Sequence, residues 1–349
     1  MTRLREWLAA GYAGEMRYIG DRLEAYEHPS HVLDGARSVV MLAMNYRSVE
    51  PRSQAAGEGR VARYAWSADY HDLVHERLRS LAQVLLDAAP TARVRGVVDT
   101  APLLEREFAQ LAGLGWIGKN TLLLNARLGS WFFLAALLTD LELNYDDPFL
   151  GDHCGTCRAC LDACPTGAFP VPYVLDSRKC ISYLTIELRS AVPREMRAGM
   201  GDWLFGCDIC QEVCPWNRHA PANAEKDFMA SACSNPVELA SLFWLDDAAF
   251  RRRFRHTPLW RPKRRGVLRN AAIVLGNQRD SDAVPGLARG LDDPEPMVRG
   301  ACAWALGQCS GRQAMAVLRQ RALIESDADV LTEIASAIDL HLERETREL

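Results

Sequence analysis

The sequence has no apolar run long enough to span a membrane. Its longest strongly apolar stretch, WFFLAALL at 131–138, is far shorter than the roughly 20 residues of a membrane-spanning helix, and we interpret it as a buried strand. The first residues contain neither an uninterrupted apolar region with a small-residue cleavage site nor a twin-arginine pair. We therefore expect no export signal, no membrane partner and a cytoplasmic location.

Disulfide bonds are also not expected, although the chain has 11 cysteines. Thiols stay reduced in the cytoplasm, and eight of the 11 cysteines fall between residues 154 and 214. Such a concentration indicates metal or redox chemistry. With 349 residues, of which 48% are hydrophobic and 25% are charged, the chain is long enough for two or three globular domains.

Hydrophobic periodicity predicts that the N-terminal part is a sheet covered by helices. Apolar residues recur at helical spacing over 72–88, and VRGVVDTAP then has the pattern of a strand that enters a loop. Two more buried strands are expected at 38–46 and 129–140. We expect a multidomain α+β protein. Its expected parts are an α/β domain over 1–150, a compact cysteine-rich domain over 151–222, a connecting helical and basic segment over 223–259, and a helical-repeat domain over 260–349.

The C-terminal part repeats itself. LRNAAIVLGN at 268–277 returns as VRGACAWALGQ at 298–308, and Gly276 and Gly307 lie 31 residues apart (307 minus 276). Alanine-rich helical sequence with a period near this value is typical of helix pairs stacked as a HEAT-like α-solenoid. A plain helical bundle is the alternative.

Four cysteines and a proline in CGTCRACLDACP, residues 154–165, match the CxxCxxCxxxCP pattern of two-cluster ferredoxins. The first three cysteines bind one cubane, each through a different iron, and the fourth ligates the other cluster. A second run, CDICQEVCP at 207–215, repeats the spacing of the last three cysteines. Its missing partner is then Cys180, displaced by an insertion at 181–206. We assign cluster 1 to Cys154, Cys157, Cys160 and Cys214, and cluster 2 to Cys164, Cys180, Cys207 and Cys210.

Two structural zinc sites are the alternative, since zinc also takes four thiolates. Zinc modules usually separate two CxxC pairs by a longer spacer and need no CxxCxxC triple, so the spacing favours two [4Fe-4S] clusters. Two clusters imply an electron-transfer path, but the cysteine pattern does not identify the acceptor of the electrons. The remaining cysteines, Cys233, Cys302 and Cys309, are expected to be small buried hydrophobic residues.

Three further motifs each allow two interpretations. HDLVH at 71–75 places two histidines at i and i+4, as in HExxH metalloproteases, but aspartate replaces the glutamate and no third ligand is evident, which favours an ordinary helix face. GLGWIGKN at 113–120 fits neither nucleotide-binding glycine pattern, although a glycine-lined turn that approaches a large ligand stays open. Asp99 is either the N-cap of a helix in APLLEREFAQLA or a functional acid in a cleft, and the residues alone favour the cap.

The segment 251–269 contains nine Arg or Lys and no acidic residue, in a chain whose net charge is -4. Such an asymmetry predicts binding of a polyanion, and the interleaved Phe254 and Trp260 are available to stack on bases. A solvated basic face is the alternative. Its position beside a solenoid favours nucleic acid.

Taken in this order, the cysteine pattern, VVDTAPLLEREFAQLAGLGWIGKN, KCISYLTIE and HTPLWRPKRRGVLRNAAIVLGN closely resemble the epoxyqueuosine reductases over nearly the whole chain. The resemblance implies an oxidoreductase that reduces epoxyqueuosine to queuosine at the wobble position of a tRNA with a GUN anticodon. It also implies base-off cobalamin bound by an α/β domain at 1–150, a ferredoxin-like domain with two [4Fe-4S] clusters, and the core plan of reductive dehalogenases. An unidentified low-potential electron donor is implied as well, and we expect a monomer.

The resemblance gives Asp99 the role of proton donor and so favours a functional acid over a cap. Electrons would pass from cluster 1 to cluster 2 and then to cobalt, while Asp99, kept protonated by burial beside the corrin, protonates the departing epoxide oxygen. The cobalamin motif DxHxxG is absent, and RVARYAWSADYH at 60–71 lacks the cysteine that some members place near cobalt. With Asp99, the expected cobalamin contacts are Gly118, Lys119 and Asn120 of the GWIGKN turn and Asp208 beside cluster 2, because the electron path has to adjoin the corrin. Family position adds Arg22 and Ala62.

The resemblance also implies a ligand for the basic segment, namely the anticodon stem-loop of tRNA, which the segment would bind through phosphates. The expected contacts are Arg261, Lys263, Arg264, Arg265 and Arg269. Two other functions are compatible with the clusters. One is a cobalamin-dependent reductive dehalogenase, which would act on a small molecule; the basic solenoid and the lack of an export signal argue against it. The other is a non-catalytic polyferredoxin, which would bind no corrinoid.

Overall fold

The computed structural model describes residues 1–223, 225–229 and 234–347, so that Cys233, for which burial is expected, lies outside the described residues. The chain divides into two units, and each is built from three separate segments. Unit 1 comprises Met1–Val49, Ser67–Cys180 and Asp208–Met229. Unit 2 comprises Glu50–Trp66, Ile181–Cys207 and Ala230–Leu349.

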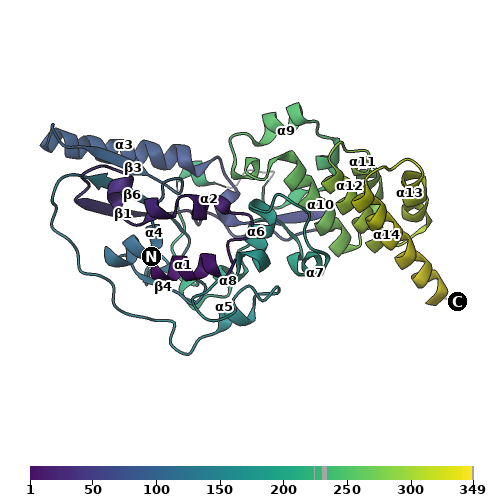
Figure 1. The fold of residues 1–349 in the computed structure, drawn as a ribbon, viewed down its shortest axis with the longest axis horizontal. Coiled ribbons are helices and arrows are strands. Elements are labelled where there is room, and N and C mark those ends of the chain that lie inside the picture. The colour runs from purple at the N-terminus through teal and green to yellow at the C-terminus, as the bar shows by residue number, and fades with distance from the viewer. Residues whose placement is uncertain (224, 230–233, 348–349) are drawn as a thin grey trace. The chain divides into compact units, whose positions relative to one another are not determined.

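A three-stranded antiparallel sheet forms the centre of unit 1 (Figure 1). β6 (Phe132–Thr139) lies between β1 (Ser38–Asn45) and β3 (Val94–Val97) and runs antiparallel to both. All eight residues of β1 pair with β6, from Ser38 opposite Thr139 to Asn45 opposite Phe132. The strands predicted from the hydrophobic runs are therefore confirmed, as is a mixed helix and sheet fold.

Helices cover both faces of this sheet (Figure 1). Leu78 of α3 (Tyr70–Ala88) shares a core with Leu137, whereas Ala109 of α4 (Glu105–Leu111) shares a different core with Leu138. Neighbouring residues of β6 enter different cores because side chains alternate along a strand. Full burial of a side chain such as Leu138 stabilises the fold by roughly 1.5–3 kcal/mol. The two cores hold β3 and α4 in place, and Asp99 lies in the loop between them.

The rest of unit 1 consists of short elements joined by loops. They are α1 (Thr2–Ala9), α2 (Arg17–Asp21), the 3-10 helices η1 (Leu23–Tyr26) and η2 (Pro29–His31), β4 (Trp116–Ile117), β5 (Leu123–Leu124), α5 (Ala159–Asp162), η4 (Ser177–Lys179), α8 (Ile209–Glu212), η6 (Pro215–Asn217) and η7 (Lys226–Phe228). β4 and β5 pair as a hairpin. Pro165 and Pro215 follow α5 and α8 closely and prevent these helices from continuing, so the thiols are carried by loops and single helical turns.

Stacked helices form the C-terminal part of unit 2. α10 (Lys263–Gln278), α12 (Pro296–Gln308) and α14 (Ala328–Arg347) pack in succession, together with α11 (Val284–Gly290) and α13 (Arg312–Ala322). A Cβ on Gly276 would lie 2.9 Å from the Cα of Ala305, and one on Gly307 would lie 2.8 Å from the Cα of Ala337. Each glycine therefore allows its helix to pack closely against the next helix of the stack. The same packing requirement in successive layers is the physical origin of the repeat.

Unit 2 also contains a small sheet in which β2 (Glu58–Val61) pairs parallel with β7 (Trp203–Phe205) and antiparallel with β8 (Val237–Glu238). Its other elements are η3 (Arg63–Ala65), α6 (Ile181–Ile186), α7 (Arg194–Arg197), η5 (Ala198–Met200), η8 (Ala240–Trp244), α9 (Asp247–Phe254), η9 (Pro258–Trp260) and η10 (Ser281–Ala283). Cys302 and Cys309 are fully buried, as expected. Among the described residues, no helix combines the length and the apolar composition needed to cross a bilayer.

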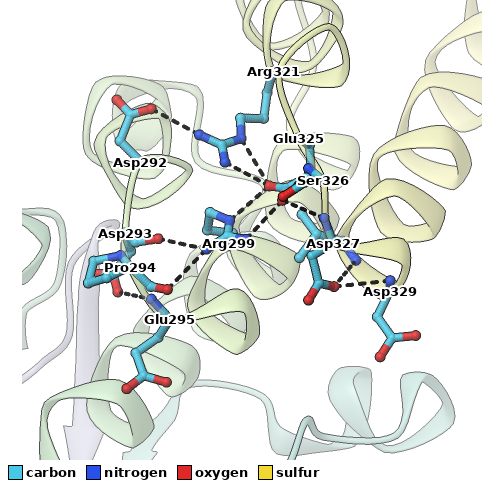
Figure 2. Close-up of polar contacts among 11 residues, drawn as sticks. Asp292, Asp293, Pro294, Glu295, Arg299, Arg321, Glu325, Ser326, Asp327 and Asp329 are labelled. Atoms are coloured by element: carbon cyan, nitrogen blue, oxygen red, sulfur yellow. Dashed lines mark hydrogen bonds and ion pairs between the residues drawn. The ribbon is translucent and has the colours of Figure 1, made fainter.

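A buried ion-pair network ties the last helices together (Figure 2). Glu325 precedes α14, and both its oxygens accept hydrogen bonds at 2.8 Å from Arg299 of α12. Arg321 of α13 donates to Glu325 at 2.8 Å and lies 3.3 Å from Asp292. The hydrogen bonds from Arg299 lower the pKa of Glu325 far below its ordinary value, even though burial opposes this. One carboxylate thus joins three successive helices.

Candidate active site

Four thiols of the cysteine-rich segment lie close together in unit 1. Burial raises the pKa of Cys160 to about 11, and the neighbouring thiols Cys214, Cys154 and Cys157 raise it further by charge repulsion. Burial likewise raises the pKa of Cys214, with Cys154 and Cys157 again among its neighbours. These are the four cysteines assigned to cluster 1. Their thiols suit a metal cluster, because bound iron stabilises the thiolate form that burial and mutual repulsion disfavour.

The described residues contain no group of three or more His, Cys, Asp or Glu side chains arranged to hold one metal ion. A cubane makes a different demand, since each of its cysteines binds a different iron. Two helical turns, α5 and α8, pack against each other and carry Cys160 and Cys210 at corresponding places in the two CxxCxxxCP runs. This pairing reproduces the internal duplication of a two-cluster module.

The second set of cysteines is less completely described. Cys164 accepts a hydrogen bond from the backbone N–H of Ala168 at 3.4 Å, and Cys180 directly follows η4. Cys207 belongs to unit 2, whereas Cys164, Cys180 and Cys210 belong to unit 1. The assembly of cluster 2 therefore stays a prediction from the spacing.

Lys119 holds the loop that carries two of the cysteines assigned to cluster 1. Its Nζ donates hydrogen bonds to the carbonyl oxygens of Gly155 at 2.6 Å and Cys157 at 2.9 Å. The sequence does not indicate this role, since the expectation for Lys119 is a contact with cobalamin. The neighbouring Asn120 is 4% exposed, and its Nδ2 has no hydrogen-bond acceptor among the described residues. A buried amide donor without an acceptor suits a polar edge of a bound cofactor. A side chain at Gly118 would meet Leu124.

Asp99 lies at the end of β3 in a left-handed backbone conformation, with φ at 55°. The cap interpretation is wrong, because α4 begins at Glu105 with Leu104 as its N-cap and has no side-chain cap. Instead, the backbone N–H of Asp99 donates a hydrogen bond to Glu105 at 2.8 Å. Left-handed backbone at a residue other than glycine is costly and clusters at functional sites.

The side chain of Asp99 faces Tyr70 and His71, which begin α3. The Tyr70 hydroxyl donates to Asp99 Oδ2 at 3.1 Å, and His71 Nε2 lies 3.6 Å from the same oxygen. On its other side, His71 Nδ1 lies 2.6 Å from Asp69 Oδ1. The first histidine of HDLVH is thus held between two carboxylates and is the residue whose role the sequence does not reveal.

The charges around Asp99 set the protonation of its neighbours. Burial by itself would lower the pKa of His71, but the hydrogen bonds and charges of Asp69 and Asp99 outweigh burial and raise the pKa to about 9. Burial raises the pKa of Glu105 to about 7, although the hydrogen bond from Asp99 opposes this. The Asp99 side chain itself is 65% exposed, so its expected burial beside a corrin stays a prediction.

The other predicted cobalamin contacts fall in different places. Burial raises the pKa of Tyr26, the charge of Arg22 lowers it, and the charge of Asp99 raises it. Because both charges act on the same tyrosine, Arg22 lies near Asp99. Asp208 is 2% exposed at the start of α8, where its carbonyl accepts from the backbone of Gln211 and Glu212. Ala62 is buried in unit 2 and donates its N–H to Phe205 at 2.8 Å.

The basic segment separates into structural and exposed cations. Arg269 is 1% exposed, and its guanidinium donates to the carbonyls of Leu184, Leu188 and Ser190, so the predicted tRNA contact at this residue is corrected to a structural role. Arg264 is mostly buried and paired with Asp293.

The other predicted tRNA contacts are exposed, but two of these cations lie close to carboxylates. Arg261 pairs with Glu187, and Arg265 lies 3.8 Å from Glu295. Lys263 is exposed over the Trp260 ring. Phe254 is buried and does not face solvent, which corrects the suggestion that it stacks on bases.

The arginines of α9 and of its end differ from these. Arg251, Arg252, Arg253 and Arg255 are exposed, and none pairs with a carboxylate among the described residues. The sequence pattern contains them but gives no reason to place them ahead of Arg261–Arg269. Burial and ion pairing, which are visible only in the fold, make that distinction.

The duplicated thiol module, the acid–histidine–acid arrangement around Asp99 and the stacked helices together define an iron-sulfur oxidoreductase with a helical-repeat domain. Family models agree with each part: 4Fe-4S double cluster binding domain at residues 153–217, epoxyqueuosine reductase QueG, DUF1730 at 27–100, and HEAT repeats at 263–339. The last match confirms the predicted HEAT-like solenoid, and the first confirms a two-cluster ferredoxin-like module.

Known proteins are similar over most of the chain. Epoxyqueuosine reductase from Pseudomonas aeruginosa is 42% identical over 310 residues, which cover 87% of this chain and 86% of the relative. A crystal structure of epoxyqueuosine reductase with an epoxyqueuosine-modified tRNA-Tyr stem loop matches with a TM-score of 0.89 and 32% identity, over 97% of this chain and 90% of that one. The enzyme from Bacillus subtilis, seen with an aspartate catalytic loop swung out of the active site, matches with a TM-score of 0.84 and 31% identity, over 91% and 86%. The chain belongs to the epoxyqueuosine reductase family.

Proposed function

We propose that this chain reduces epoxyqueuosine in tRNA to queuosine, with electrons from two [4Fe-4S] clusters and cobalamin, and with Asp99 as the proton donor. The observation that carries the proposal is the placement of Asp99 between Tyr70 and His71 in a chain of this family. The reaction consumes two electrons and two protons, breaks both bonds to the epoxide oxygen, and yields an alkene and water. The Bacillus subtilis relative, with its aspartate catalytic loop, supports an acid in this position.

Cobalamin, when bound, supplies reducing equivalents to the epoxide carbon. The residues that fit such a group in unit 1 are Asn120, with its buried amide donor, and Asp99, with its exposed carboxyl group. Both would face a ligand while keeping the protein partners that hold them. Iron and corrinoid content test this part: anaerobic reconstitution is expected to give cobalamin absorbance bands on a broad iron-sulfur shoulder. Clusters without corrinoid uptake would instead indicate a polyferredoxin.

Asp99 and His71 act on the proton in this scheme. Asp99 delivers a proton to the departing oxygen, and His71, oriented by Asp69 at 2.6 Å, returns one to Asp99. Tyr70 fixes the carboxyl group by its hydrogen bond, and its ring stacks on Phe133 with centroids 4.0 Å apart. The half-buried Glu105 holds the backbone of Asp99. The chain thus supplies a positioned acid and a means to reload it.

Replacement of His71 by glutamine is expected to move the alkaline limit of turnover to lower pH. The raised pKa of His71, about 9, means that the pair keeps its proton below this pH and loses it as the pH rises through it. Glutamine holds no proton, so Asp99 alone must retain it, and turnover at pH 8 should fall by about 10-fold or more. The pH profile of kcat measures this. His75→Gln, at the other histidine of the motif, is the matched control, and an unchanged profile in His71→Gln would contradict the relay.

The proposed tRNA surface consists of the exposed α9 arginines and Lys263. Burial, and to a smaller extent the charges of Arg189 and Arg261, lowers the pKa of Lys263, so Lys263 has two other cations near it. Phosphates would relieve this repulsion and release counterions. The relative bound to a modified tRNA stem loop supports this substrate.

Removal of the charges at Arg251, Arg252 and Arg255 by glutamine is expected to weaken stem-loop binding and to flatten its dependence on salt. The slope of log affinity against log salt should fall by about one for each phosphate that the protein no longer neutralises. Fluorescence anisotropy of a labelled stem-loop over a salt series measures the slope. Arg312→Gln, an exposed arginine on α13, is the control. A slope equal to that of the unmodified protein would refute the surface.

A further inference from the structure

The β4–β5 hairpin and its turn lie against the cluster 1 ligands. Trp116 of β4 and Leu124 of β5 pack with Cys214 and Cys154 in one buried group. From the turn, Lys119 donates hydrogen bonds to the carbonyls of Gly155 and Cys157. Gly155 lies between two assigned ligands of this loop, Cys154 and Cys157, and Cys157 is itself one of them. The hairpin therefore touches both chain segments that contribute thiols to cluster 1.

The hairpin itself is locked to the ligand loop by further hydrogen bonds. Tyr173 donates its backbone N–H to the Lys119 carbonyl at 3.0 Å and its hydroxyl to Asp152 at 2.5 Å. Asp152 in turn accepts from the backbone N–H of Cys154 at 2.8 Å. A closed set of contacts thus fixes Lys119 relative to Cys154, so that its charge has a defined position.

Trp116 adds a buried donor that the protein does not use. Its side chain is 1% exposed, and its indole Nε1 has no acceptor among the described residues. Three aromatic rings surround it, Phe149, His153 and Trp216, at centroid distances of 5.6, 4.9 and 4.9 Å. Aromatic faces offer only weak acceptors, whereas buried indole N–H groups usually have a partner. Cys214 and Cys154 pack in the same group as Trp116, so the sulfur of a bound cluster or of its cysteines would be an acceptor of suitable chemistry.

We propose that this hairpin sets the reduction potential of cluster 1, with the Trp116 indole N–H donating to a cluster or cysteine sulfur and the Lys119 ammonium fixing the ligand loop. Hydrogen bonds to sulfur and nearby positive charge both stabilise the reduced, more negative cluster and so raise its potential. Trp116 and Lys119 are positioning residues in this role. The inference rests on the two-cluster assignment and not on the tRNA reaction.

Midpoint potentials of the two clusters, from redox titration followed by electron paramagnetic resonance, test the inference in the reconstituted full-length protein. Trp116→Phe keeps an aromatic ring and removes the N–H, and it is expected to make one of the two midpoint potentials more negative. Lys119→Met is expected to shift the same cluster in the same direction, and Lys119→Arg to restore it because the charge returns. Trp244→Phe, at an exposed tryptophan of unit 2, and Lys226→Met are the controls, with both potentials unchanged.

Unchanged potentials in both Trp116→Phe and Lys119→Met, at full iron content, would overturn the inference while leaving the cluster assignment intact. If Trp116→Phe fails to retain iron, the comparison of Lys119→Met with Lys119→Arg decides. Equal potentials in those two variants would then overturn the role of the Lys119 charge. Absence of iron from the unmodified protein would refute the cluster assignment itself.

Discussion

Asp99→Asn is expected to retain both clusters and tRNA binding and yet to lose turnover, on the order of 100- to 10,000-fold. Asparagine keeps the size of the side chain and can still accept the Tyr70 hydrogen bond seen at 3.1 Å. It has no acidic proton to give to the departing oxygen, and it cannot be reloaded by His71. Turnover number, iron content and stem-loop affinity, measured on one preparation, separate chemistry from assembly.

Asp72→Asn is the matched control, because Asp72 is an exposed acid in the first turn of α3 and does not face this group. Its turnover should equal that of the unmodified protein. Full activity in Asp99→Asn would show that the proton comes from elsewhere. A loss of activity accompanied by a loss of iron or of tRNA affinity would show a structural role instead.

Glu325→Gln is expected to destabilise the helical repeats by about 3–5 kcal/mol. The Glu325 side chain is fully buried and pairs with Arg299 and Arg321, whose side chains are 10% and 15% exposed. Glutamine leaves two cations with only one neutral oxygen between them, and removal of one partner from a buried pair is costly for this reason. Urea unfolding followed by circular dichroism measures the loss.

The same ion pairs make the stability depend on pH in a defined direction. Hydrogen bonds from Arg299 hold the pKa of Glu325 well below its ordinary value, so this stabilisation is complete above the pKa of glutamate in the unfolded chain. It declines as the pH falls below about 4.3, the ordinary pKa of glutamate. The Glu325→Gln variant should lack this part of the acid sensitivity. Glu343→Gln, an exposed glutamate on α14, is the control, and equal stability of the two variants would contradict the network.

The sequence predicts the elements whose patterns are local. Hydrophobic runs locate β6, which is almost entirely buried, and β1, which is half-buried beside it. The two echoed glycines locate the repeat because close helix packing excludes a Cβ at Gly276 and at Gly307. Cysteine spacing groups the four thiols assigned to cluster 1, which also lie close together in unit 1, because a cubane fixes the distance between its ligands. The discontinuous composition of the two units is not predictable, since contiguous segments such as Glu50–Trp66 carry no signal for the unit that they join.

Individual site residues are harder to predict, because their roles depend on neighbours that are distant in the sequence. Asp99 has the sequence context of a helix cap, whereas α4 begins six residues later, at Glu105. His71 has the pattern of an ordinary helix face because its partner Asp99 is 28 residues away (99 minus 71). Nine cations in one segment are equivalent by composition, yet Arg269 is buried whereas Arg251 is exposed. Burial and pairing, which composition does not contain, decide among them.

Anaerobic turnover of an epoxyqueuosine-containing tRNA stem-loop tests the central claim most directly. The reconstituted protein is given a chemical low-potential reductant, with or without cobalamin, and the product nucleosides are identified by mass spectrometry. The account predicts that epoxyqueuosine loses one oxygen atom and becomes queuosine only when both iron-sulfur clusters and cobalamin are present. Conversion at the same rate without cobalamin, or no conversion by protein that holds both clusters and cobalamin, would contradict it.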